Sequence, residues 1–589
     1  MKNLTTILVV IIILFLKATI LLADTRIYVD PRLGNDGNNG RDIDHPLQTI
    51  YKAGLICHGG DTIFIRGGLP YTNFYDEFYQ VDTLGLIPVW IMPYFNESVI
   101  LDGVGHTFLD YEAVLNIQHA RNVVIENLHV RNNLNGGAGI RVVSNYPPLF
   151  ITRDVIVRNC LVHDTYRQGI LVQANNVTIE NCEIYNAVMR NEKEKLGTTG
   201  WDVALGTFHW PDPIDYWTNI VFKNNIVHNS WGEGIVALRC ENFTIENNHV
   251  YDCYSAYIYV DNSRKGVIRN NWVHSTNDTY NRQYRPDFRA PGSGIIWAAE
   301  QNFAHYGVDS LVSDLDIYNN LIVRTNTPIS WWRDINNTFP NNSYENINVY
   351  YNTIYLAFAI QAFHLDPNTS GVYTPTNCNF KNNIICKGQY PLGTTHTYFT
   401  TSSHYKSWNI DYNCFIDGDI PSPIPISHNI EGTPSFVDPT NLYVDTSFRI
   451  RANSNCRHKA IPIDELEKDY WNALRDNNMP CIGIHEYGGT SGSGQIENEL
   501  PGNYYLGQNF PNPFNPVSLI QFGLKRNAHV SLTVYDIFGR ELTRLVDSEF
   551  REANDYKVKF DGTNYSSGIY FYRLTADNFA QSKKMLLVK

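Results

Sequence analysis

The residue types that can carry chemistry gather in four segments near the middle of the sequence, where each segment places an acid close to an aromatic residue. Glycosidases usually act with a pair of carboxyl groups. One protonates the leaving group, and the other either attacks the sugar or activates a water molecule. Crowding of acids raises one pKa and so supplies the proton donor. The four candidate catalytic acids are Asp202, Glu233, Asp261 and Glu300.

Asp202 and Glu233 form the best candidate pair. Alignment of the strands that contain them puts Asp202 beside Gly234, so Glu233 is expected about one strand spacing away. Asp261 and Glu300 end the two following strands at nearly equivalent places, where they would extend the pair or complete an oxygen-rich Ca²⁺ site. The alternative is that these residues are ordinary solvated acids at strand ends.

Large aromatic residues accompany the acids and are candidates for stacking on sugar rings, because their apolar faces match the C–H side of a pyranose. The same residues would equally serve to pack loops onto a scaffold. The candidates for substrate binding are Trp201, Trp231, Tyr257, Trp297, Trp331 and Trp332.

Basic residues offer a second chemistry, in which a base removes a proton beside a neutralised carboxylate, as in a polysaccharide lyase. His228 belongs to a run of His and Tyr residues that recurs on successive strands, and Lys265 lies in a neighbouring segment. His228 and Lys265 are therefore further catalytic candidates, although a surface stack of rings is the simpler explanation for the histidine.

A short pattern that recurs nine times must position these residues. Each copy is an apolar alternating strand that runs into Asn and then into a second apolar strand, as in VVIENLHV from Val123 and FTIENNHV from Phe243. Alternation with a period of two puts Val and Ile on one buried face. The repeated Asn falls at 127, 159, 181, 224, 247, 270, 319 and 382, and Tyr351 takes its place in one copy. We expect stacked coils of short strands whose Asn side chains hydrogen-bond along the stack.

This pattern resembles the right-handed parallel β-helix of the pectate-lyase-like superfamily over about residues 25 to 390. The opening IYVDPRLGNDGNNG at Ile27 resembles the cap of such proteins, which an open strand edge requires. SFRIRANSNC at Ser447 and CIGIHEYGG at Cys481 resemble a closing segment. The resemblance implies an all-β fold, a right-handed parallel β-helix solenoid followed by a small C-terminal β-sandwich. It implies no particular reaction, because no lyase signature is matched.

The two ends of the sequence indicate export. Residues 1–23 have a basic start and an apolar run, as expected of a secretory signal peptide, although an uncleaved anchor is the alternative. After the β-helix domain at 24–487 and a Gly/Ser-rich linker at 488–502, residues 503–589 resemble the C-terminal sorting domain of the type IX secretion system. The motifs that carry this resemblance are NFPNPFNP, YDIFGR, SGIYFYRL and KKMLLVK. We expect a protein that is secreted or attached to the outer-membrane surface.

Composition restricts the partners. A net charge of −13 argues against nucleic acid, which requires clustered Lys and Arg. We expect a monomer whose partners are a polysaccharide and the type IX secretion machinery. Among the ten Cys residues, Cys160 and Cys182 occupy equivalent positions and are expected to stay unbonded, whereas Cys456 and Cys481 are the better disulfide candidates.

Three classes of function remain open. A glycoside hydrolase would use the acid pair, a lyase would use a base with Ca²⁺ or another cation, and a non-catalytic surface protein would bind glycan or serve adhesion. The acids favour the hydrolase, with Ca²⁺ as a possible cofactor.

Overall fold

The computed structural model describes two compact units, divided between residues 488 and 489. It describes residues 25–489 and 504–587, with gaps at 81–86, 96, 145–150, 194–201, 209–215, 277–290, 301–310, 333–342, 358–360, 366–374, 388–396, 400–406, 417–419, 421–423, 425–427, 508, 510–513, 515, 525, 538, 552–554 and 578. The predicted signal peptide and most of the predicted linker lie outside the described residues.

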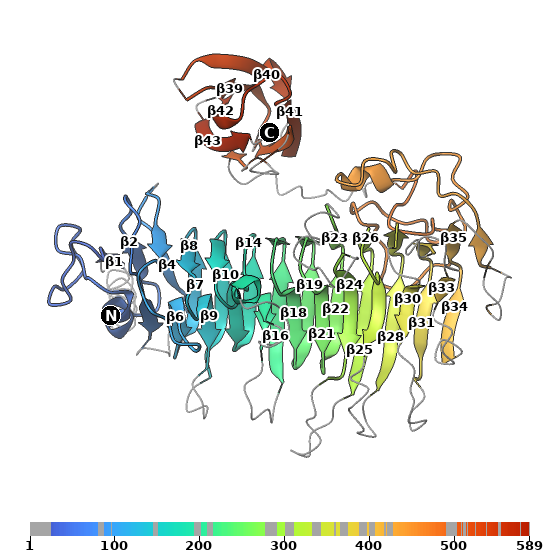
Figure 1. Cartoon of the computed structure of the whole chain (residues 1–589), viewed down its shortest axis with the longest axis horizontal. Helices are drawn as coiled ribbons and strands as arrows, with labels where there is room; N and C mark the ends of the chain where they lie inside the picture. The colour runs from blue at the N-terminus through green and yellow to red at the C-terminus, as the bar shows by residue number, and fades with distance from the viewer. Residues whose placement is uncertain are drawn as a thin grey trace, which may run out of the picture. The chain divides into compact units, whose positions relative to one another are not determined.

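The first unit is a parallel β-helix whose described strands form three sheets of 13, 12 and 11 strands. We name these sheets A, B and C in that order. One coil contributes one strand to each sheet, and every step to the next coil is a parallel pairing, as in β7 with β10 and β9 with β12. In Figure 1 the strands follow one another along the helix from β1 to β34. The predicted all-β solenoid is therefore confirmed.

The strands have the following bounds. Sheet A contains β1 (Arg26–Val29), β2 (Thr62–Ile65), β4 (Val89–Pro93), β7 (Arg121–Glu126), β10 (Arg153–Arg158), β13 (Asn175–Glu180), β16 (Trp217–Lys223), β19 (Cys240–Glu246), β22 (Arg264–Arg269), β25 (Val312–Tyr318), β28 (Tyr344–Tyr350), β31 (Cys378–Lys381) and β34 (Trp408–Asp411). Sheet B contains β5 (Ile100–Asp102), β8 (His129–Asn133), β11 (Leu161–Thr165), β14 (Glu183–Tyr185), β17 (Ile226–His228), β20 (His249–Tyr251), β23 (Trp272–His274), β26 (Leu321–Val323), β29 (Thr353–Tyr355), β32 (Ile384–Cys386), β35 (Cys414–Ile416) and β36 (Ile430–Glu431). Sheet C contains β3 (Asp76–Tyr79), β6 (Ala113–Gln118), β9 (Ala138–Val143), β12 (Ile170–Gln173), β15 (Val203–Thr207), β18 (Glu233–Leu238), β21 (Ala256–Asp261), β24 (Ser293–Ala298), β27 (Ile329–Trp332), β30 (Gln361–Leu365) and β33 (Thr397–Phe399).

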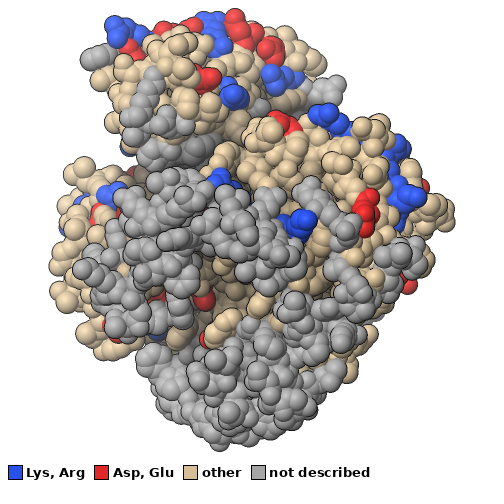
Figure 2. Space-filling view, turned by 45° about the vertical axis from the view of Figure 1, so that its right-hand side comes forward, with Lys and Arg blue, Asp and Glu red and all other residues tan. Residues whose placement is uncertain are grey.

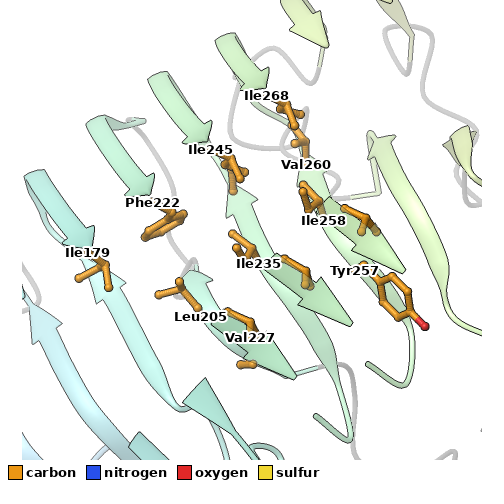
Figure 3. Close-up of a cluster of buried hydrophobic side chains, with 14 of the residues drawn as sticks. Ile179, Leu205, Phe222, Val227, Ile235, Ile245, Tyr257, Ile258, Val260 and Ile268 are labelled. Carbon is orange, nitrogen blue, oxygen red and sulfur yellow. The ribbon is translucent and has the colours of Figure 1, made fainter. Parts of the chain in front are cut away.

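The interior between the sheets is an apolar core built from rows of equivalent residues. Along sheet A, Ile179, Phe222 and Ile245 are register partners on successive strands and are fully buried. Leu205 and Ile235 of sheet C are also register partners in the same core (Figure 3). The expectation that the alternating Val and Ile face is buried is confirmed.

The repeated Asn residues form the corner between sheets A and B. All eight, together with Tyr351, have φ between +53° and +61°, a left-handed conformation that Asn tolerates better than most residues. Their side chains do not make the expected ladder. The ladder is made by the residue that follows, because that side chain points inward and is buried.

The ladder links eight buried Asn residues in seven successive side-chain hydrogen bonds of 3.0–3.1 Å: Asn225, Asn248, Asn271, Asn320, Asn352, Asn383, Asn413 and Asn429. Each amide also serves backbone groups, as Asn271 does by donating to the Ile245 carbonyl at 2.9 Å. The predicted ladder of Asn side chains is present, but it is formed by the residue one position later in the sequence than predicted. In earlier coils Cys160 and Cys182 take this position.

Two segments cover the ends of the helix. Near the N-terminus, α2 (Ile50–Ile56) begins with Thr49, whose side chain accepts the Lys52 N–H, and it buries Ile50 and Ala53. Near the other end, residues 428–489 contain little regular structure beyond the 3₁₀ helix η3 (Asp445–Phe448). Both placements agree with the predicted cap and closing segment.

Corner residues of three coils hold the closing segment. Arg475 donates to the Asn319 side chain at 2.8 Å and lies over the Tyr351 ring at 3.8 Å. Tyr351 donates its hydroxyl to the Ile461 carbonyl at 2.8 Å, and Asn382 exchanges hydrogen bonds with the same residue. This contact gives Tyr351, the exception in the repeat, a structural role.

All ten Cys residues are buried and free of disulfides. The unbonded state predicted for Cys160 and Cys182 is confirmed, and the disulfide suggested for Cys456 and Cys481 is wrong. Cys481 instead donates to the Glu486 carboxylate at 3.4 Å.

The second unit is a small sandwich of two antiparallel sheets around one apolar core. The sheets are β37 (Tyr505–Leu506), β38 (Val517–Gly523) and β41 (Asp555–Asp561), and β40 (Glu541–Arg551), β39 (Ala528–Tyr535), β42 (Gly568–Ala576) and β43 (Phe579–Leu587). The predicted β-sandwich is confirmed.

Candidate functional site

The four predicted acids lie on neighbouring strands of sheet C. Glu233 begins β18, Asp261 ends β21, Glu300 follows β24 by two residues and Asp202 precedes β15. Val203 and Glu233 are register partners, so Asp202 lies beside Gly232 and not beside Gly234 as predicted, although it is still one strand away from Glu233. The Glu233 N–H donates to the Asp202 carbonyl at 3.0 Å. Sheet C thus brings the predicted acids to one region.

Asp202 is buried, and two arginine side chains contact its carboxyl group. Arg167 binds its carboxylate with Nε at 3.1 Å, Arg190 approaches it with Nε at 3.0 Å, and Gln168 donates to Oδ1 at 2.8 Å. Arg190 begins the short helix α3 (Arg190–Lys193). Two guanidinium groups and one amide therefore already occupy the Asp202 carboxylate.

Glu233 has the opposite environment. Its side chain is buried, and no described residue forms a hydrogen bond or an ion pair with its carboxyl group. Burial raises the pKa of Glu233 well above the ordinary value of 4.5, and the charges of Glu300, Asp261 and Asp202 raise it further. Glu233 therefore keeps its proton at a pH where an exposed Glu has lost it.

Asp261 and Glu300 are joined by a hydrogen bond. The Glu300 N–H donates to Asp261 Oδ1 at 2.9 Å, whereas Asp261 Oδ2 is buried without a hydrogen-bond partner. Burial and then the Glu300 charge raise the pKa of Asp261 well above its ordinary value. Glu300 itself is half-buried and accepts a 2.5 Å hydrogen bond from the Tyr259 hydroxyl. We name Glu233, Asp261, Glu300 and Tyr259 the acidic cluster.

Tyr259 was missed at the sequence level, although the signal was present. It lies two residues before Asp261 on β21 and so shares its face of the strand. Arg167 and Arg190 were also missed, because they come from other coils and contact Asp202 only after folding.

An apolar outer surface of sheet C surrounds the acidic cluster and lowers the local dielectric constant. Its buried side chains are Val203, Val236, Leu238, Ala256, Tyr259 and Ala298. In such surroundings a protonated carboxyl group has a lower free energy than a second negative charge beside the first. The surface therefore reinforces the raised pKa values.

Most of the aromatic side chains predicted to bind sugar point into the core of the β-helix. Trp231, Tyr257, Trp297 and Trp331 are buried in the interior core of the β-helix, so they cannot meet a sugar. Trp297 follows the inward-facing Ile295 by two residues and so shares its face. Among the described candidates, Trp332 at the end of β27 is the exception, with 41% of its surface exposed. Trp201 lies outside the described residues.

The predicted bases lie on other sheets. His228 belongs to sheet B, where its ring stacks between Tyr185 and Tyr251 at centroid distances of 5.1 and 4.7 Å. Lys265 belongs to sheet A and pairs with Glu241 at 2.5 Å. Neither residue shares a sheet with the acidic cluster, so the structure does not bring these two candidate bases together with the acids.

Two observations concern metal ions and surface charge. Within the described part of the chain, no group of three or more His, Cys, Asp or Glu side chains is arranged to hold a metal ion. On the face seen in Figure 2, the coloured Lys and Arg side chains are scattered among neutral ones.

Comparison with known proteins finds a family model that matches part of each unit. Residues 508–589 match the model of the secretion system C-terminal sorting domain, and residues 97–200 match the right handed beta helix region. The chain carries a type IX sorting domain. The protein is therefore secreted or attached to the cell surface. None of the helices in the described part, which starts at residue 25, is long and apolar enough to cross a bilayer.

Solved structures of similar fold include carbohydrate-active enzymes. A GH136 lacto-N-biosidase from Eubacterium ramulus is 16% identical, with a TM-score of 0.35 over 66% of this chain and 64% of that one. The pectate lyase Pel9A is 13% identical, with a TM-score of 0.43 over 78% and 96%. The PL6 alginate lyase AlyGC is 13% identical, with a TM-score of 0.39 over 75% and 58%. This chain thus spans less than two thirds of the lacto-N-biosidase. No curated protein sequence matches.

Proposed function

We propose that the protein is a secreted carbohydrate-active enzyme that hydrolyses glycosidic bonds in a polysaccharide. The observation that carries this proposal is the buried carboxyl group of Glu233, which has no partner among the described residues and whose pKa is raised by burial and by the neighbouring acids. A carboxylic acid that keeps its proton near neutral pH is what protonation of a glycosidic oxygen requires.

Glu300 is the second carboxyl group that best fits the reaction. It is half-buried, and the hydroxyl of Tyr259 fixes its orientation. As an anion it would stabilise the positive charge that develops on the sugar ring, or activate the attacking water. The pairing expected between Glu233 and Asp202 is replaced in this proposal, because Arg167 and Arg190 already occupy the Asp202 carboxylate.

Asp261 supports the proposed pair of Glu233 and Glu300. It is completely buried and accepts the Glu300 N–H, so it touches the peptide that carries Glu300. Burial and the charge of Glu300 raise its pKa, and protonation of Asp261 would limit the negative charge beside Glu300. We assign Asp261 a positioning role.

A lyase is less well supported, because both predicted bases, His228 and Lys265, are on other sheets. Elimination would leave an unsaturated sugar, whereas hydrolysis produces only new reducing ends. Product chemistry therefore separates the two reactions directly.

The test incubates the mature chain with neutral and acidic polysaccharides, with and without Ca²⁺, and records reducing ends and ultraviolet absorbance together. We expect reducing ends without absorbance, lowered about 100-fold or more in Glu233→Gln. The matched control is Glu241→Gln, which removes an acid from sheet A and is expected to keep full activity. Absorbance that rises with reducing ends would refute the acid assignment. Silence across the panel would refute the enzyme and favour a glycan-binding protein.

A further inference from the structure

Arg141 is an outward-facing arginine of sheet C that has no partner among the described residues. It lies on β9, it is half-buried, and its Nε atom is buried without a hydrogen-bond partner. Within the described part of the chain it forms no hydrogen bond and no ion pair. Nearby outward arginines do form ion pairs: Arg131 with Asp102, Arg158 with Glu126 and Arg167 with Asp202.

The guanidinium keeps its charge despite this environment. Burial and then the charge of Arg167 lower the pKa of Arg141 to about 10, which leaves it protonated at neutral pH. A half-buried cation without a counter-ion is costly in the free protein. An anion that binds there would remove part of this cost.

The nearest acids are engaged elsewhere. Glu112 accepts the Leu109 N–H at 2.7 Å, and Glu77 accepts the Gln118 amide at 2.5 Å. Asp110 approaches Arg167 at 3.5 Å. None of these carboxylates reaches the guanidinium of Arg141 within ion-pair distance.

Arg141 lies in the same outward row of sheet C as the acidic cluster. The register runs from Arg141 through Leu171, Gly206 and Val236 to Tyr259. Four strand steps separate the two ends, which corresponds to about 19 Å at the usual spacing of strands. Gly206 has no side chain in the middle of this row. A single glycan chain of several sugars is long enough to reach both ends.

An exposed aromatic residue, Tyr75, belongs to the same region of sheet C as Arg141. Tyr75 is 38% exposed, and its ring is parallel to that of His106 at 5.1 Å, which fixes its orientation. Glu77, two residues after Tyr75, is in register with Asn116, and Asn116 is in register with Arg141, so Tyr75 lies within two strands of Arg141. Burial raises the pKa of the Tyr75 phenol, and the charge of Arg141 opposes this rise. A flat ring beside a cation suits a sugar that carries an anionic substituent.

We propose that Arg141 and Tyr75 form a subsite for an anionic sugar unit, whose carboxylate or sulfate ester binds the guanidinium while the ring lies against Tyr75. This inference rests on the proposed function, because it assumes that the glycan runs along sheet C to the acidic cluster. An anionic polysaccharide is compatible with that cluster, since Glu233 and Asp261 are uncharged when protonated.

Binding without turnover tests the subsite. The full chain carrying Glu233→Gln is titrated calorimetrically with polygalacturonate, with a sulfated galactan and with a neutral glucan. We expect binding of an anionic glycan that Arg141→Met weakens about ten-fold or more, the loss expected for a charge-assisted hydrogen bond. Met keeps the apolar stem, and thermal unfolding verifies the fold. Preference for polygalacturonate assigns the carboxylate, and preference for the galactan assigns the sulfate.

The matched control is Arg153→Met, which removes a 46% exposed arginine from sheet A. It makes the same change in net charge and should leave the dissociation constant unchanged. Equal weakening by both variants, no effect of Arg141→Met, or equal binding of the neutral glucan would overturn the proposal. If binding depends on Arg141 but the wild-type protein shows no hydrolysis, the subsite is supported and only the proposed hydrolase activity is refuted.

Discussion

Replacement of Glu233 by Gln should change stability in a way that depends on pH. The folded pKa of Glu233 lies above the ordinary value of 4.5, so the folded state holds a proton that the unfolded chain has released. The stabilisation that this proton represents is complete below pH 4.5 and is lost as pH rises through the folded pKa. Gln has the same shape and no ionisation, so the variant lacks this loss.

The magnitude follows from the number of protons. Each proton that the folded state holds in excess lowers the free energy of unfolding by about 1.4 kcal/mol per pH unit within that window. Asp261 has a raised pKa as well and contributes a similar slope. We therefore expect Glu233→Gln to remove the contribution of about one proton, about 1.4 kcal/mol per pH unit, from the pH dependence of the free energy of unfolding. The variant then gains stability relative to the wild type as pH rises.

The assay is urea unfolding followed by circular dichroism at several pH values between 4.5 and 8. Glu241→Gln is the control, because Arg264 and Lys265 lower the pKa of Glu241 through hydrogen bonds. The stability of Glu241→Gln relative to the wild type should therefore not increase at high pH. If Glu233→Gln and the wild type differ by a constant amount at every pH, Glu233 is ionised in the fold and cannot be the proton donor.

Three further predictions concern the rest of the chain. Asn271→Ala removes the acceptor of the Asn248 N–H, bound at 3.0 Å, and should cost about 2–4 kcal/mol in urea unfolding, whereas the exposed Asn409→Ala should cost little. Burial lowers the pKa of His274 to about 3, so its contribution to stability is present above pH 6.5 and is lost as pH falls towards 3. In His274→Phe the acid-induced loss should shrink by about 1.4 kcal/mol per pH unit, and a wild-type slope in the variant would contradict this. Deletion of residues 508–589 should abolish export in a host with type IX secretion while the thermal midpoint of the β-helix stays unchanged, because the two units have separate cores; a lowered midpoint would contradict this.

Much of the fold could be predicted because the repeat combines two local signals. Alternating apolar residues defined the strands, and the recurring Asn defined the corner. The ladder was misplaced by one residue because both positions favour Asn for different reasons, a left-handed backbone at Asn247 and a buried amide at Asn248. Cys160 and Cys182, which precede the ladder at the inward position, were the clue that this position faces the core.

The site was predicted less completely. Period-two alternation correctly placed the acids on sheet C, but it fails where strands begin. Tyr257 and Ile258 are consecutive and both lie in the interior core, so alternation could not decide the direction of Tyr257. The partners of Asp202 could not be predicted, because Arg167 and Arg190 approach it from other coils.

The closing segment has a mechanical consequence. In a parallel β-helix the hydrogen bonds between coils run along the helix axis, so tension at one end would detach the last coil first. Here the chain leading to the sorting domain first passes Ile461 and Arg475, which are bonded to corners on three inner coils. A pull on a surface-attached copy would be borne by these inner coils, and β34 to β36 would be shielded from peeling.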